Sequence, residues 1–103
     1  MKHLKVKKEG HICWVYLNRP NSLNALNTEI LRELTEFNAS LRYDLESRVV
    51  IYTGTGDNFS SGADLKEKRK SITRLEAWRN NFGKPAIWSF LKVDQITIAA
   101  ING

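Results

Sequence analysis

Cysteine and histidine are scarce in this chain, which limits the kinds of site that it can build. Among 103 residues there are one cysteine and two histidines. A single cysteine cannot form an internal disulfide, and Cys13 lies in an apolar run with no histidine or aspartate beside it, which predicts a small buried side chain rather than a nucleophile. His3 and His11 have no further histidine or cysteine at ligand spacing, so the sequence predicts no metal site.

Long hydrophobic runs are absent as well. No apolar run approaches the roughly 20 residues that span a bilayer, and the basic N-terminus leads into no apolar segment of the signal-peptide kind. We therefore expect a cytoplasmic protein without membrane attachment. Hydrophobic residues make up 42% of the chain and charged residues 26%, which is typical of a globular domain. The net charge of +5 favours polyanionic partners and leaves both nucleic acid and a phosphate-bearing ligand open.

The apolar pattern predicts two strands, a helix and a third strand. Residues 4–8 and 11–17 are typical of a hairpin, and the second of these strands is apolar on both faces, so we expect both faces to be buried. Asn27 is a good N-cap for the helix that follows. Residues 49–52 form the next strand, and the strand–helix–strand order predicts parallel pairing in an α/β fold. The apolar residues of the helix recur every three or four positions, at Ile30, Leu34, Phe37, Leu41 and Leu45.

The second part of the chain is expected to add helices and a last strand. A helix is expected from Asp64 and another helical pattern from Ser71. The run from Gly83 to Pro85 interrupts this pattern, and residues 86–93 are expected to resume it at a new angle. Residues 96–101 are typical of a strand, the last one in the chain.

The glycine-rich turn after residues 49–52 is the most informative segment. Residues 53–67 read Thr-Gly-Thr-Gly-Asp-Asn-Phe-Ser-Ser-Gly-Ala-Asp-Leu-Lys-Glu. They lack the Gly-Lys-Ser/Thr of a P-loop and the third glycine of a dinucleotide fingerprint. A strand that leads through glycines into a helix start presents backbone N–H groups that can hold a negative oxygen. On the residues alone, an oxyanion or phosphate site and a purely structural turn are equally good interpretations.

Six short motifs, taken in their order along the chain, resemble the crotonase (enoyl-CoA hydratase/isomerase) superfamily, and together they cover nearly the whole chain. The resemblance implies a crotonase-like (ClpP/crotonase) β-β-α spiral of the α/β class, with residues 1–103 as the N-terminal part of an acyl-CoA-binding domain. The motifs are Asn-Arg-Pro at 18–20, Asn-Ala-Leu-Asn at 24–27, Val-Val-Ile at 49–51, Gly-x-Gly at 54–56, Phe-Ser-x-Gly-Ala-Asp-Leu-Lys-Glu at 59–67 and Ile-Ala-Ala-Ile-Asn-Gly at 98–103.

The resemblance also implies a site for an acyl-CoA thioester, with coenzyme A as part of the substrate and no separate cofactor. In this family two backbone N–H groups hold the thioester oxygen, and one of them matches Ala63. The resemblance places Ala25 and Leu26 on one side of the coenzyme A. It places Ser61, Gly62, Ala63, Asp64 and Leu65 along its adenine and pantetheine path, with Lys66 near its phosphates.

Two features near this turn have alternative interpretations. Asp64 resembles a catalytic carboxylate, but an aspartate at a helix start more simply caps free N–H groups. The basic cluster of Lys66, Lys68, Arg69 and Lys70 fits a solvated helix face, contacts to coenzyme A phosphates or an RNA-binding surface. RNA binding needs stacking aromatics beside the charges, which makes nucleic acid the weaker expectation.

The family's second oxyanion donor and its acid/base carboxylates lie beyond the final Asn-Gly pair, outside these 103 residues. Within the chain we expect Glu29, Glu33, Glu36 and Glu46 to face solvent. We therefore expect a parent protein that hydrates 2-enoyl-CoA and assembles as a homo-oligomer, a trimer or hexamer in this family. The 103-residue chain by itself is expected to be inactive. The alternative is a non-catalytic RNA- or protein-binding module derived from the same fold.

Overall fold

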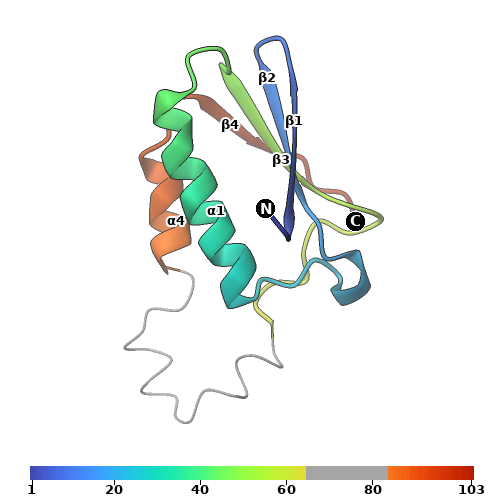
Figure 1. The fold of residues 1–103 in the computed structure, drawn as a ribbon. Coiled ribbons are helices and arrows are strands. Elements are labelled where there is room, and N and C mark those ends of the chain that lie inside the picture. Colours follow the sequence, from blue (N-terminus) through green and yellow to red (C-terminus); the bar gives the residue numbers. More distant parts are fainter. Residues whose placement is uncertain (65–83) are drawn as a thin grey trace.

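The computed structural model describes residues 1–64 and 84–103, which form a four-stranded sheet with two α-helices on one of its faces (Figure 1). Strands β1 (Leu4–Glu9) and β2 (Ile12–Leu17) form an antiparallel hairpin. Strand β3 (Val49–Gly54) pairs in parallel with β2, and β4 (Ile96–Ala99) pairs in parallel with β3. The predicted hairpin and the predicted parallel pairing are confirmed, as is the α/β class.

Helix α1 (Thr28–Ser40) connects β2 to β3 and begins as the sequence predicts. The side chain of Asn27 accepts a hydrogen bond of 2.8 Å from the backbone N–H of Ile30, which satisfies a donor that the first turn leaves free. The helix continues into a short 3₁₀ turn at Leu41–Tyr43. The helical spacing predicts Leu45 on the buried stripe, but this residue is 92% exposed, because the helical segment ends before it.

Helix α4 (Lys84–Leu91) packs beside α1 on the same face of the sheet (Figure 1). Pro85 stands in its first turn, where a missing N–H costs no helical hydrogen bond, so the helix begins two residues earlier than predicted. A polar chain joins the layers: the hydroxyl of Tyr52 donates to Asn38, whose side chain donates to Ser89 at 2.9 Å. The helices predicted from Asp64 and from Ser71 lie outside the described residues.

The two faces of the sheet differ in burial. Paired residues on neighbouring strands point to the same face, and the register pairs Cys13 with Val50 and Trp14 with Ile51. Cys13 and Val50 are fully buried beneath the helices, and burial raises the pKa of the Cys13 thiol. Trp14 and Ile51 point to the opposite face and stay partly exposed. The predicted burial of Cys13 is confirmed, whereas the prediction that β2 is buried on both faces is wrong within the described residues.

Candidate functional site

The segments that follow β2 and β3 meet beyond the carboxyl ends of these two strands. Because β2 and β3 are parallel, the segments that follow them leave the sheet at the same end. The carboxyl ends of parallel strands are the usual place for a ligand site in an α/β fold. Leu26 then forms an isolated parallel bridge with Ala63. The N–H of Leu26 donates to Gly62 at 2.7 Å, and the N–H of Asp64 donates to the carbonyl of Leu26 at 3.0 Å. The structure thus places the two predicted site segments, 25–26 and 61–64, side by side.

This bridge leaves the backbone N–H of Ala63 free. In a parallel bridge the two neighbours of the bridged residue supply the hydrogen bonds, so the N–H of Ala63 points away from Leu26. Within residues 1–64 and 84–103 it has no acceptor, and Ala63 is only partly buried. A partly exposed, fixed N–H group of this kind is what an oxyanion donor requires.

The neighbouring N–H groups are already occupied. Ser61 donates its N–H to the carbonyl of Leu23 at 3.0 Å. The N–H of Gly62 donates to the Ser60 hydroxyl at 3.0 Å, and that hydroxyl donates to the carbonyl of Asn24 at 2.7 Å. Within this stretch, Ala63 alone keeps an N–H without an acceptor among the described residues.

Asn24 fixes the glycine-rich turn from one side. Its side chain is fully buried, with a backbone φ of 53° that asparagine tolerates better than most residues. Its amide donates to the carbonyls of Thr55 at 3.0 Å and Asn58 at 2.7 Å, while its Oδ1 accepts from the N–H of Arg19 at 2.8 Å. One amide therefore joins the segment after β2 to the turn after β3.

Asn102 fixes the same turn from the other side. Its amide donates to the carbonyls of Gly54 at 3.0 Å and Gly56 at 2.8 Å. Its Oδ1 accepts from the hydroxyl of Thr53 at 3.2 Å. The segment after β4 thus reaches the turn as well, and the turn lies between two asparagine amides.

An ion pair ties Asp64 to the segment after β2. The Arg19 guanidinium donates to Asp64 Oδ2 at 3.2 Å and to the carbonyl of Ala25 at 2.7 Å. Both side chains are mostly buried, at 17% and 15% exposure. Arg19, Asn24 and Asn102 all stand in the motifs that carry the family resemblance, yet sequence reasoning gave them no role in the site.

Leu65, Lys66 and the rest of the basic cluster lie outside the described residues. Their predicted contacts with coenzyme A, and the RNA-binding alternative that depends on them, therefore stay predictions.

His3 contacts two glutamates of α1. Its Nε2 lies 3.0 Å from Glu29, and its backbone N–H donates to both carboxylate oxygens of Glu33 at 3.0 Å. The hydrogen bond with His3 lowers the pKa of the Glu29 carboxyl. Glu33 is 4% exposed, so its predicted solvent-facing position is wrong. The three side chains offer ligand atoms within 4.8 Å of one another, and their mutual hydrogen bonds already account for this arrangement.

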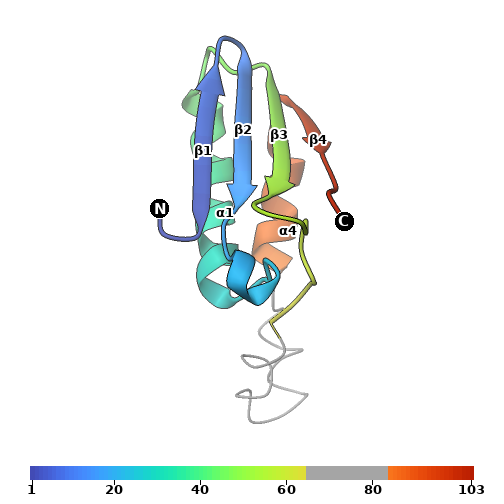
Figure 2. The same ribbon diagram turned by 90° about the vertical axis from the view of Figure 1, so that its right-hand side faces the viewer.

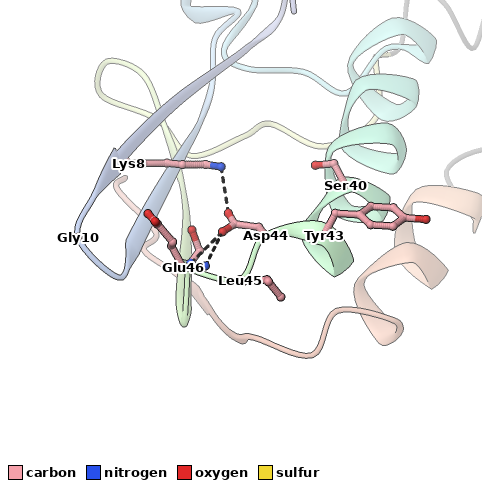
Figure 3. Close-up of a pocket in the computed structure, with 8 residues that line it drawn as sticks. Lys8, Gly10, Ser40, Tyr43, Asp44, Leu45 and Glu46 are labelled. Carbon is pink, nitrogen blue, oxygen red and sulfur yellow. Dashed lines mark hydrogen bonds and ion pairs between the residues drawn. The ribbon is translucent and has the colours of Figure 1, made fainter.

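A hollow of about 460 Å³ lies at the opposite end of the sheet, beside the turn between β1 and β2 (Figure 3). Lys8 reaches across it to Asp44, with Nζ and Oδ2 3.0 Å apart. Hydrogen bonds from Ser47 and the contact with Lys8 hold the pKa of the Asp44 carboxyl well below its ordinary value. This hollow is separate from the Ala63 segment, which follows the other ends of β2 and β3.

Within the part of the chain that the structure describes, no helix has the length and apolar character needed to cross a membrane.

Comparisons of sequence and structure relate the chain to known proteins. A sequence model of the enoyl-CoA hydratase/isomerase family matches residues 7–103. The chain is similar to the (E)-benzylidenesuccinyl-CoA hydratase of Thauera aromatica, at 37% identity over 95 residues, and to the short-chain-enoyl-CoA hydratase of Clostridium acetobutylicum, at 32% identity over 104 residues. These matches cover 91% and 100% of this chain but 37% and 40% of the two relatives.

A solved structure shows the same relation. The crystal structure of an enoyl-CoA hydratase/carnithine racemase from Magnetospirillum magneticum matches with a TM-score of 0.91 at 33% identity, covering 100% of this chain and 40% of that chain. The chain therefore spans about two-fifths of the length of these relatives and corresponds to the N-terminal part of their fold. With the family model matched over nearly all of its length, the chain belongs to the enoyl-CoA hydratase/isomerase (crotonase) family.

Proposed function

We propose that residues 1–103 form the N-terminal part of an acyl-CoA-binding domain, in which the backbone N–H of Ala63 is one of two donors to the thioester oxygen. One observation carries this proposal: the Ala63 N–H has no acceptor among the described residues, while its neighbours are held in the bridge to Leu26. The chemistry of the parent protein would be the hydration of a 2-enoyl-CoA, in line with the activities named for its relatives.

The donor at Ala63 would act on the charge that develops during this reaction. When water adds to the double bond of an enoyl thioester, negative charge accumulates on the thioester oxygen. A donor that is already in place stabilises this charge, and the loss of one such donor costs about 100- to 1000-fold in rate. The second donor and the acid/base carboxylates would come from outside these 103 residues.

The coenzyme A part of the substrate would lie against the surface that the two bridged segments form together. Ala25 and Leu26 would contact it from the segment after β2. Ser61, Gly62 and Asp64 would contact it from the segment after β3, and Leu65 and Lys66 would continue the path toward the phosphates. Arg19 would hold the two segments together, because its guanidinium contacts both Ala25 and Asp64. We extend the proposal to a cytoplasmic homo-oligomer, a trimer or hexamer, on the basis of family membership.

Amide NMR tests the role of Ala63 in the 103-residue chain itself. Titration with crotonyl-CoA is expected to shift the Ala63 amide resonance. A matched thioether analogue, which lacks the carbonyl, is expected to shift residues near Leu26 and Ser61 but to leave the Ala63 amide nearly unchanged. Equal shifts at Ala63 for both ligands would contradict the donor role. RNA binding with a steep salt dependence and no response to crotonyl-CoA would favour the RNA-binding alternative.

A further inference from the structure

Two glutamates of α1 converge on the residue that precedes β1. Nε2 of His3 lies 3.0 Å from Oε2 of Glu29, and the backbone N–H of His3 donates to both carboxylate oxygens of Glu33 at 3.0 Å. The imidazole and the two carboxylates each offer one ligand atom, and these atoms lie within 4.8 Å of one another. Figure 2 shows that β1 starts at the same end of the sheet as α1. The fold thus gathers three possible metal ligands from two distant parts of the sequence.

Glu33 is a buried carboxyl group without a counter-charge. The residue is 4% exposed. Both of its oxygens accept from one backbone N–H, and none of the ion pairs among residues 1–64 and 84–103 involves it. Buried carboxylates are normally paired with a cation or coordinate a metal, because burial penalises the charged form. The N–H group gives this carboxylate a hydrogen bond but leaves its charge uncompensated.

The basic side chains nearby do not compensate this charge. Arg32 pairs with Glu36 on the exposed side of α1, with 3.7 Å between the two groups. The hydrogen bond with His3 lowers the pKa of Glu29, and the charges of Lys2 and Arg32 add to this effect. These charges act on the outer carboxylate, whose side chain is 39% exposed. The inner carboxylate keeps a place for a cation.

We propose that His3, Glu29 and Glu33 form a binding site for a divalent metal ion of the zinc class. Imidazole nitrogen and carboxylate oxygen both bind Zn²⁺ at about 2.0 to 2.2 Å, whereas Ca²⁺ and Mg²⁺ prefer sites made of oxygen alone. The sequence hides this set of ligands, because His3 is 26 positions from Glu29 and 30 positions from Glu33.

The geometry needs only small changes to hold the ion. Two ligand atoms bound to one tetrahedral zinc ion lie about 3.4 Å apart, so the 3.0 Å between His3 and Glu29 opens slightly. The ion takes the place of the proton that these two groups share, and that proton is released to solvent. The carboxylate of Glu33 turns toward the ion as the third ligand, and water completes the coordination.

A bound ion would join the start of β1 to α1. The carbonyl of His3 also accepts from the N–H of Asn18 at 2.8 Å, so the ion would be connected to the segment that leads to Arg19. A ligand that binds only the folded chain stabilises it, and we therefore expect the unfolding temperature to rise with the zinc concentration. The inference is independent of the proposed role of Ala63, and its tests use no acyl-CoA.

Calorimetric titration of the 103-residue chain with zinc chloride provides the test. The chain carries no histidine tag, because a tag would itself bind the metal. We expect one zinc ion per chain and an unfolding temperature that falls back when EDTA is added. Cobalt(II) serves as the spectroscopic probe: its visible absorption bands are expected to appear on binding and to disappear when zinc displaces it.

The two histidines of the chain supply a matched pair of variants. His3→Ala removes one ligand but keeps the backbone N–H from which Glu33 accepts, so the chain is expected to fold. Loss of an outer partner of a metal ligand already costs about 10- to 100-fold in affinity, and we expect His3→Ala to cost at least tenfold. His11→Ala changes the other histidine, whose Nδ1 lies 2.8 Å from the carbonyl of Glu46, and is expected to bind zinc as the native chain does.

Glutamine variants test the two carboxylates. Glu29→Gln and Glu33→Gln keep the size of the side chain and remove its charge, and each is expected to weaken zinc binding at least about tenfold. Glu36→Gln changes an exposed glutamate on the same helix and is expected to have no effect. Circular dichroism of each variant confirms that the chain folds. Because Glu29 is partly exposed, its variant tests the site even if Glu33→Gln does not fold.

Absence of saturable zinc binding by the native chain would overturn the inference. So would zinc binding that is unchanged in Glu29→Gln and Glu33→Gln, since the ion would then be held by histidine alone, and so would zinc binding that is lost in His11→Ala. The proposed function is judged separately, because the amide titration with crotonyl-CoA involves none of these three side chains.

Discussion

At the scale of single residues, Asn24 shows how much of the site depends on one buried amide. Both of its amide hydrogens and its Oδ1 have partners, and its own carbonyl accepts from Ser60. Through Ser60 it also reaches the N–H of Gly62, which is adjacent to Ala63. We therefore assign Asn24 a positioning role: it holds the segment that carries the proposed donor and does not itself contact the thioester.

Replacement of Asn24 by aspartate tests this positioning role. The variant keeps the shape of the side chain but loses both donors, so the carbonyls of Thr55 and Asn58 lose their buried partners. Each lost partner costs about 1 to 3 kcal/mol, and we expect the free energy of unfolding to fall by at least about 2 kcal/mol in urea denaturation. Asn21→Asp, at an exposed position nearby, is the control and is expected to change it by less than about 0.5 kcal/mol. Equal effects at both positions would contradict the role.

Gly54 is required because the turn folds back onto it. A Cβ at this position would lie 2.0 Å from the carbonyl oxygen of Asn58 and 2.6 Å from that of Phe59. We therefore expect Gly54→Ala to lower the free energy of unfolding by about 3 kcal/mol or more, since backbone must move to accept it. Gly10→Ala has open space but a φ of 57°, so its cost is expected near 1 kcal/mol. Thermal unfolding of both variants measures the difference, and a milder effect at Gly54 than at Gly10 would show that the turn does not pack this closely against Gly54.

At the scale of elements, the turn between α1 and β3 is organised by Asp44. Its carboxylate accepts from the N–H groups of Glu46 at 3.0 Å and Ser47 at 2.9 Å, and it pairs with Lys8. These contacts close the turn, so Leu45 turns away from the core. The helical spacing of Leu45 predicted burial, but the local hydrogen bonds of Asp44 ended the helix first.

The same turn predicts a pH dependence of stability. The pKa of Asp44 in the folded chain lies below its ordinary value, whereas an aspartate in an unfolded chain has a pKa of about 3.9. As the pH falls from about 5, the unfolded chain takes up this proton first, so the stabilisation by the Asp44 carboxylate is lost at acid pH and is complete at neutral pH. In Asp44→Asn the position no longer titrates.

Urea denaturation at several pH values between about 5 and 2.5 measures this effect. We expect the free energy of unfolding to fall less steeply with acid in Asp44→Asn than in the native chain. Asp94→Asn, at an exposed position after α4, is expected to follow the native slope. A native slope in Asp44→Asn would show that this turn does not contribute.

Local patterns in the sequence predicted the elements well, and long-range contacts were harder to predict. The cap at Asn27 and the hairpin of β1 and β2 are readable because they depend on near neighbours. Glu33 was placed in solvent because its partner, His3, lies 30 residues away. Whether a face of β2 is covered depends on which other segments pack against it, and the apolar pattern of β2 alone does not show this.

The candidate site also depends on long-range contacts. The two segments around Leu26 and Ala63 were placed together from the family resemblance, not from any local signal. The roles of Arg19, Asn24 and Asn102 escaped prediction because the hydrogen bonds that connect them to residues 53–64 join positions 31 to 49 apart. The sequence around an asparagine or arginine in a turn does not indicate which distant residue it will bind.

At the scale of the whole molecule, the proposed function depends on groups that the family resemblance places outside these 103 residues. The chain offers one candidate oxyanion donor at Ala63, and the resemblance places the other donor and the acid/base carboxylates beyond Gly103. Preorganised charge stabilisation and proton transfer each contribute factors of about 100 or more. On this division of the site, the 103-residue chain by itself is expected to hydrate crotonyl-CoA at no measurable rate.

A hybrid chain tests this expectation, because its rate of hydration can be compared directly with that of the 103-residue chain. Residues 1–103 are joined in one polypeptide to the C-terminal part of the Magnetospirillum protein, and loss of the enoyl thioester absorbance is followed for the hybrid and for the 103-residue chain. We expect hydration by the hybrid alone. In the hybrid, Ala63→Pro removes the N–H group and is expected to lower kcat about 100- to 1000-fold, while Ala63→Ser keeps that group and is expected to stay within about tenfold. Hydration by the 103-residue chain, with its mass verified, would contradict the division of the site, and equal rates for the proline and serine variants would exclude the Ala63 N–H as a donor.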